Sequence, residues 1–112
     1  MMVNAFNHLD KTKDVAKVVV SHSTQIPDAN ISNEMLRSSL ELIDTVELAK
    51  FFTVNRSSNM KDNLAFTMKV LKRNIEECGK LKDSQHCKDI ARMAMRTNQE
   101  TMNQLLKLYR EL

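Results

Sequence analysis

The sequence contains one glycine, one proline and no tryptophan among its 112 residues. β-Sheet proteins need many turns that contain glycine or proline, so this shortage indicates few turns and long helices. Leu, Met, Lys, Glu, Ala and Arg are abundant, and most of these residues favour helix. The length suffices for one hydrophobic core, so we expect residues 1–112 to form a single domain.

Long apolar runs are also absent. No segment approaches the roughly 18 apolar residues that a membrane-spanning helix needs, and residues 1–10 lack the basic and apolar regions of a secretory signal. We therefore expect a cytoplasmic protein with no membrane segment. In that compartment Cys78 and Cys87 would be free thiols unless a metal ion binds them, because a disulfide between them requires an oxidising environment.

The charge is mild and mixed in sign. The net charge is +3, and basic residues alternate with acidic ones, as in Lys69, Arg73 and Glu76. Such mixing is typical of a solvated helix face, whereas a nucleic-acid-binding surface usually carries one sign of charge and exposed aromatic residues. We therefore expect no nucleic-acid partner.

Residue patterns of the common catalytic sites are not recognisable. A single glycine excludes a glycine-rich phosphate loop, and no Ser-His-Asp or Cys-His-Asn arrangement is evident. The Glu-x-x-His pattern of ferritin-like di-iron sites does not occur. We predict that the protein is not an enzyme.

Apolar residues recur at helical spacing in four segments, near residues 4–22, 33–54, 60–78 and 87–112. These amphipathic segments, with short links between them, predict an all-α fold, an antiparallel up-down-up-down four-helix bundle. The expected N-caps are Asn30 or Ser32, Ser57 or Ser58, and Asp83 or Ser84. Gly79 is expected to end the third helix in the left-handed conformation.

The last two helices carry the clearest core pattern. Leu64, Met68, Leu71, Ile75 and Cys78 follow one another at alternating steps of four and three, which is typical of a coiled-coil-like seam. We expect this seam to face Ile90, Ala94 and Leu105 of the fourth helix.

Both cysteines lie in one segment, "EECGKLKDSQHCKD" (76–89), with the only glycine. The hairpin should bring Cys78 and Cys87 to the same end of the bundle, where they could bind one soft metal ion with His86 and a nearby methionine. Alternatively, both cysteines are small buried apolar residues without a metal. The methionines of the last two helices can also bind Cu(I), although methionine at helical spacing is more often core filler.

The segment "EECGKLKDSQHCKDIARMA" (76–94) resembles the third hairpin of the cysteine-rich four-helix-bundle copper storage proteins, in which Glu-Cys ends one helix and His-Cys opens the next. "ELAKFFTVNRSSNMKDN" (47–63) is similar to the second link of that family. The resemblance covers residues 33–104 and, more loosely, the first helix. It implies a bundle whose inward thiolates, three and four residues apart, hold cuprous ions.

Most of the family's thiol positions carry other residues here. The resemblance would place thiols at Leu42, Val46, Leu64, Thr67, Leu71, Asn74, Ile90, Ala94, Thr97 and Thr101. Only Cys78 and Cys87, with His86 beside them, are retained. Two hypotheses follow: limited cuprous binding at the turn between the last two helices, or a metal-free bundle that forms a homo-oligomer or binds a protein partner.

Overall fold

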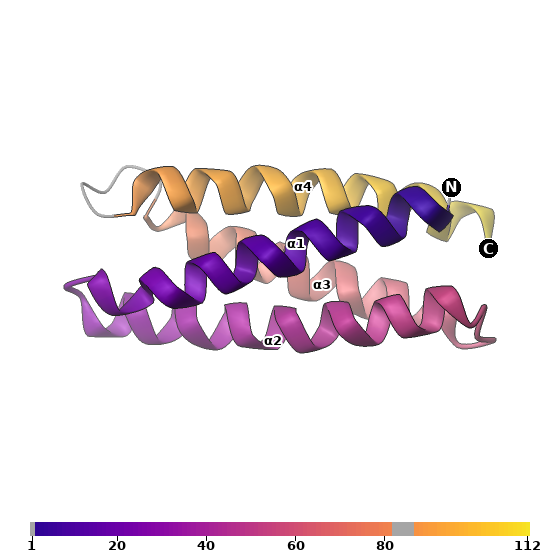
Figure 1. The fold of residues 1–112 in the computed structure, drawn as a ribbon, viewed down its shortest axis with the longest axis horizontal. Helices are drawn as coiled ribbons and strands as arrows, with labels where there is room; N and C mark the ends of the chain where they lie inside the picture. The colour runs from indigo at the N-terminus through magenta and orange to yellow at the C-terminus, as the bar shows by residue number, and fades with distance from the viewer. Residues whose placement is uncertain (1, 82–86) are drawn as a thin grey trace.

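The computed structural model describes residues 2–81 and 87–112. It contains four long helices, α1 (Met2–His22), α2 (Ala29–Val54), α3 (Met60–Gly79) and α4 (Lys88–Glu111), and one short 3-10 helix, η1 (Ser23–Gln25) (Figure 1). The described residues contain no strand. The predicted all-α four-helix bundle is therefore confirmed.

The four helices stand at the corners of a square. Each helix contacts the next one along the chain, and α1 also contacts α4. The bundle measures 43 × 18 × 18 Å. Among the residues that the structure describes, no helix is long and apolar enough to cross a membrane.

The two ends of the bundle differ in what they carry (Figure 1). The α1–α2 connection, the last turn of α3 and the first turn of α4 lie at one end, which we call the cysteine end (residues 22–28, 78–81 and 87–91). The first turn of α1, the α2–α3 connection and the last turn of α4 lie at the other end. We call this the terminal end (residues 2–6, 53–60 and 108–112).

The second helix begins earlier than predicted, at Ala29. The cap is Asp28, and the expectation of Asn30 or Ser32 is wrong. The Asp28 carboxylate accepts hydrogen bonds from the backbone N–H groups of Asn30 at 2.9 Å and Ile31 at 3.2 Å. These bonds satisfy two of the amide groups that a helix start leaves unpaired, so the helix can begin immediately after Asp28.

The third helix starts close to the predicted position, but with a different cap. Its N-cap is Asn59, whose side chain forms no capping hydrogen bond. The Ser57 hydroxyl instead accepts from the backbone N–H of Asn59 at 3.1 Å. Ser57 therefore shapes the turn before the helix without capping it, and Ser58 is not the cap either.

The end of the third helix also departs from expectation. Gly79 does not have a positive φ and is the last helical residue. The chain continues as a tight turn in which Leu81 donates to the Cys78 carbonyl at 3.0 Å, so no left-handed residue is needed there. The expected caps of the fourth helix, Asp83 and Ser84, lie outside the described residues.

The buried seam of α3 is partly the predicted one. Leu64, Leu71 and Cys78 are fully buried as expected. Met68 and Ile75 are only half-buried. They lie at the edge of the seam, where Met68 packs against the core cluster. Thr67 and Asn74 occupy the inner positions instead. The buried residues of α3 are thus Leu64, Thr67, Leu71, Asn74 and Cys78, at alternating steps of three and four. A pattern of apolar residues alone does not include Thr67 and Asn74.

The interior is unusually rich in small polar side chains. Besides its apolar residues it buries Thr12, Ser23, Ser38, Ser39, Thr45, Thr53, Asn63, Thr67, Asn74, Thr97, Asn98 and Thr101. Most of these groups form hydrogen bonds. The hydroxyls of Thr12 and Thr101, for example, lie 2.6 Å apart between α1 and α4. Paired polar groups in a core favour one register of the helices, because a shifted register would leave them unpaired.

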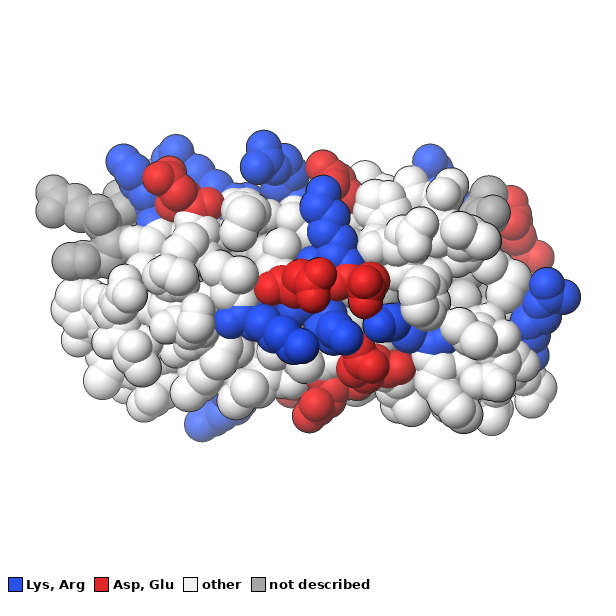
Figure 2. All heavy atoms as spheres, in the orientation of Figure 1, with Lys and Arg blue, Asp and Glu red and all other residues white. Residues whose placement is uncertain are grey.

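The charged residues on the face shown in Figure 2 are mixed in sign, with acidic and basic side chains gathered near its middle. Between α1 and α2, Lys50 lies 2.8 Å from Asp10, and Lys13 lies 2.7 Å from Glu47. The hydrogen bond from Lys50 lowers the pKa of Asp10, and the one from Lys13 lowers the pKa of Glu47. The charges of Lys13 and Lys50 are thus compensated by neighbouring carboxylates. The absence of a nucleic-acid partner stays a prediction.

Candidate metal centre

Cys78 lies in the last turn of α3 and is fully buried. Its thiol faces two acceptors, the Met35 thioether sulfur at 3.6 Å and the side-chain carbonyl oxygen of Asn74 at 3.6 Å. Met35 comes from α2, and Asn74 lies one turn earlier on α3. The cysteine sulfur is therefore held against a second sulfur atom inside the bundle.

The surroundings of this sulfur pair are apolar. Cys78 and Met35 belong to a cluster of buried residues at the cysteine end, with Val19, Ile26, Leu81, Ala91 and Ala94. Four more apolar residues and Cys87 pack against the cluster at its edge. These neighbours give the sulfur pair largely apolar surroundings, and the Asn74 oxygen is the polar atom that contacts the Cys78 thiol.

Burial, with a smaller contribution from the nearby Glu77 carboxylate, raises the pKa of the Cys78 thiol to about 12. Low-polarity surroundings disfavour the charged thiolate, and so does a neighbouring negative charge. At neutral pH the thiol is therefore protonated. A metal ion that binds Cys78 must displace this proton.

Cys87 is the N-cap residue of α4, not a residue of its first turn as expected. Its backbone is left-handed, with φ of 58°, and its side chain is half-buried. The Cys87 sulfur lies 3.8 Å from the backbone carbonyl oxygen of His22. This is a long, weak contact, so the Cys87 thiol is held only loosely. Both cysteines are free, and no disulfide joins them.

A small cavity lies beside Cys87 and Met35. It has a volume of about 10 Å³ and is lined by Val19, His22, Ile26, Met35, Leu81, Cys87, Ile90 and Ala91. Met35 therefore contacts Cys78 and also borders the cavity beside Cys87. A space of this size is comparable to one water-sized sphere. It is small enough for a single ion and too small for an organic ligand.

His22 lines the same cavity. Its Nδ1 lies 2.9 Å from the carbonyl oxygen of Val18. A carbonyl only accepts, so this contact favours the tautomer in which Nδ1 carries the proton and Nε2 has a free lone pair. His22 is therefore a candidate nitrogen ligand beside the cavity, in addition to the ligands named from the sequence. His86, the predicted histidine of the site, lies outside the described residues.

The sulfur atoms of Cys78 and Met35 are important for metal binding because few other metal ligands lie close together. In residues 2–81 and 87–112, no group of three or more His, Cys, Asp and Glu side chains is placed to hold a metal ion. Within these residues the Met35 thioether is the sulfur atom that lies beside the Cys78 thiol. Met95 packs against the same cluster, whereas Met60, Met68 and Met102 belong to the other hydrophobic cluster.

Asn74 anchors a polar network beside the sulfur pair. Its amide group donates to the hydroxyls of Ser38 at 2.9 Å and Ser39 at 3.1 Å, and its carbonyl oxygen accepts from Asn98 at 2.8 Å. The network links α2, α3 and α4 in one layer. It fixes the orientation of Asn74 and hence of the oxygen that faces the Cys78 thiol.

The positions at which the resemblance expects thiols face inward, with one exception. All are buried except Ile90, which is only partly so. Here these inner positions carry Leu, Val, Ala, Thr and Asn. No protein-family model, curated protein or solved structure matches the chain.

Sequence reasoning placed Cys78 and Cys87 at the same end of the bundle but missed Met35 and Asn74 as neighbours of the Cys78 thiol. A signal for Met35 was present. In an antiparallel hairpin, residues equally distant from the connecting link lie at the same level, and Met35 and Cys78 are nearly equidistant from the α2–α3 link. The early start of α2 at Ala29 places Met35 well inside that helix.

Proposed function

We propose that this protein binds a single cuprous ion at the cysteine end, through Cys78, Met35 and Cys87. The observation that supports this function is the 3.6 Å separation of the Cys78 and Met35 sulfur atoms inside an apolar cluster. His86, adjacent to Cys87 in the sequence, is a further ligand in this proposal, and His22 lines the same cavity as Cys87.

The chemistry fits Cu(I) better than the other common metal ions. Thiolate and thioether ligands select soft ions such as Cu(I), whereas carboxylate and carbonyl oxygens suit Mg²⁺ and Ca²⁺. The ion would replace the proton of Cys78 and relieve the cost of a buried thiolate. The buried position of Cys78 would keep the bound ion away from water.

The expected stoichiometry is one ion per chain. The resemblance to copper storage proteins supports the type of bundle and the type of metal. However, the inner positions that would hold further ions carry residues such as Thr67 and Thr97 instead of cysteine. Multi-ion storage is therefore not part of the proposal.

A competition titration tests the proposal. Reduced protein is titrated against a chromogenic cuprous chelator under anaerobic conditions. Wild type should withdraw about one ion per chain, and Cys78→Ser should bind at least tenfold more weakly, since even lost supporting residues cost metal sites about 10–100-fold. Met35→Leu should also weaken binding, whereas the matched control Met68→Leu, outside the cluster, should not. Failure of wild type to compete would refute the function.

A second candidate function is a metal-free module that forms homo-oligomers or binds a protein partner. Exposed apolar side chains favour it, since Phe51 is 60% and Phe66 52% exposed. Exposed apolar surface is typical of interaction sites where it forms a contiguous patch. Sedimentation at increasing concentration tests this candidate: a rise in mass without copper would support it, and a constant monomer mass would argue against self-association.

A further inference from the structure

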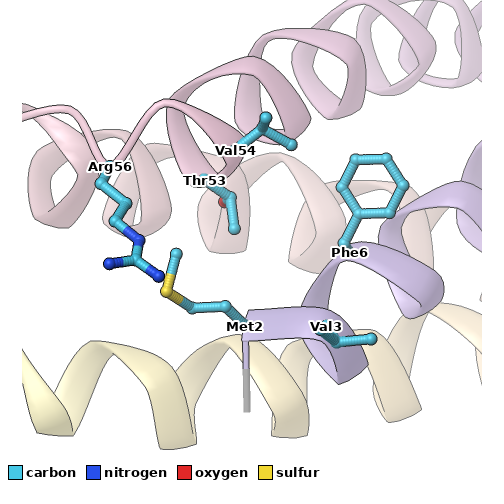
Figure 3. Close-up of a pocket in the computed structure, with 6 residues that line it drawn as sticks. All are labelled: Met2, Val3, Phe6, Thr53, Val54 and Arg56. Atoms are coloured by element: carbon cyan, nitrogen blue, oxygen red, sulfur yellow. The ribbon is translucent and has the colours of Figure 1, made fainter.

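A second site lies at the terminal end, away from the cysteines. A pocket of about 320 Å³ opens between the first turns of α1 and the last turn of α2 (Figure 3). It is lined by Met2, Val3, Phe6, Thr53, Val54 and Arg56. Pockets for small ligands begin at about this size and are mostly apolar with a few polar groups. One cation and no acidic residue line this pocket.

Arg56 is held in an uncommon backbone conformation. Its φ is 48°, in the left-handed region that favours glycine. Two hydrogen bonds impose it: Arg56 N–H donates to the Thr53 carbonyl at 3.3 Å, and Ser57 N–H donates to the Phe52 carbonyl at 3.1 Å. This is the glycine-type ending of a helix, with arginine at the glycine position. From this position the Arg56 side chain extends over the pocket toward Met2 (Figure 3).

The Arg56 guanidinium has no partner in the part of the chain that the structure describes. None of the ion pairs or side-chain hydrogen bonds among residues 2–81 and 87–112 involves it. The nearby cation Lys50 differs, since it lies over the Phe6 ring and is paired with Asp10. Arg56 therefore offers a planar fork of donors, which matches a carboxylate.

Thr53 adds an independent sign of an unfilled site. It lines the pocket, is only 2% exposed, and its hydroxyl has no hydrogen-bond partner within the described residues. A buried hydroxyl without a partner is costly.

We propose that this pocket binds a small amphipathic carboxylate, a linear chain of about eight carbons in a space of this volume. The carboxylate pairs with the Arg56 guanidinium and accepts from the Thr53 hydroxyl. The apolar tail packs against Met2, Phe6 and Val54. This site is independent of the copper proposal, because it lies at the opposite end of the bundle and uses none of the same residues.

Sodium octanoate is the probe, and octanamide is its uncharged control of the same shape. Binding is followed by amide chemical shifts in two-dimensional NMR. Wild type should bind octanoate saturably with Kd on the order of 1 mM, as expected for a ligand of this size. The largest shifts should fall on residues 2–6 and 53–56. Octanamide should bind at least fivefold more weakly.

Substitutions test separately the roles of the Arg56 charge and the Thr53 hydroxyl in octanoate binding. Arg56→Gln should lower octanoate affinity at least fivefold, while Arg96→Gln, an exposed arginine of α4 outside the pocket, should leave it unchanged. Thr53→Val should lower it by a smaller factor. Equal affinity for octanoate and octanamide, an unaffected Arg56→Gln variant, or shifts spread over the other end of the bundle would each overturn the proposal.

Discussion

The thiol of Cys78 on α3 points at the thioether sulfur of Met35 on α2, at a distance of 3.6 Å. The Asn74 oxygen lies at the same distance from the thiol. These contacts place a protonated thiol between a soft acceptor and a hard one, in a buried and largely apolar region. Its titration, its hydrogen bonds and its metal chemistry are therefore coupled to the stability of the bundle.

Alkaline pH should destabilise the protein through Cys78. The folded-state pKa of Cys78, about 12, lies above the unfolded value of 9.0. The stability that comes from keeping this thiol protonated is therefore fully present below pH 9 and is lost as pH rises toward 12. The free energy of unfolding should fall by about 2–3 kcal/mol between pH 8 and pH 11 from this group. Urea denaturation of wild type and Cys78→Ala measures it, because the difference cancels other titrations. Parallel pH profiles would contradict the buried-thiol assignment.

Asn74 should be costly to remove. Asn74→Leu leaves the hydroxyls of Ser38 and Ser39 and the Asn98 amide without their buried partner, and each such loss costs about 1–3 kcal/mol. We expect a loss of at least about 3 kcal/mol of unfolding free energy, measured by urea denaturation. The matched exposed control is Asn103→Leu on α4. A loss below about 1 kcal/mol would show that the polar layer is not a unit.

Leu71 tests the apolar part of the core. It is fully buried in the hydrophobic cluster that also contains Leu42, Leu64 and Leu105. Leu71→Ala should lower the free energy of unfolding by about 2–5 kcal/mol. The control is Leu40→Ala, since Leu40 is 47% exposed and surface changes usually stay within about 0.5 kcal/mol. Similar losses for the two variants, in thermal or urea unfolding, would mean that the inner face of α3 is misassigned.

Gly79 should be replaceable. Its φ is not positive, and a methyl group there would meet only the Met95 side chain, at 3.7 Å. Gly79→Ala should therefore raise stability by about 0.5–1 kcal/mol, because alanine loses less backbone entropy in a helix. An increase in melting temperature checks this. A decrease would indicate that the α3–α4 turn needs glycine after all.

Periodicity and the shortage of glycine and proline were enough to predict the four helices and their antiparallel order. The same reasoning failed at polar core positions. Asn74 is buried because Ser38 and Asn98 on other helices satisfy its amide group, and a single sequence does not place those partners. Thr67 instead donates to the Asn63 carbonyl one turn earlier on α3, which lets its hydroxyl be buried. The alternating steps of four and three place Met68 and Ile75 in the seam, although both are only partly buried.

The candidate site was predictable only in part. The hairpin placed both cysteines at one end, and this is confirmed. Met35 lies within the predicted second helix, but only the structure shows that it faces Cys78, because the contact depends on how α2 packs against α3. The role of His86 stays a prediction, since it lies outside the described residues. The homo-oligomer or protein partner and the cytoplasmic location also stay predictions.

Copper K-edge X-ray absorption of the one-to-one cuprous complex tests the central claim most directly, because it reports the atoms bound to the ion. Wild type should give a first shell dominated by sulfur. Cys78→Ser and Met35→Leu should each lower the sulfur contribution, and Met68→Leu should leave the spectrum unchanged. A first shell of nitrogen and oxygen alone, or a spectrum that Cys78→Ser does not alter, would contradict the proposed sulfur site.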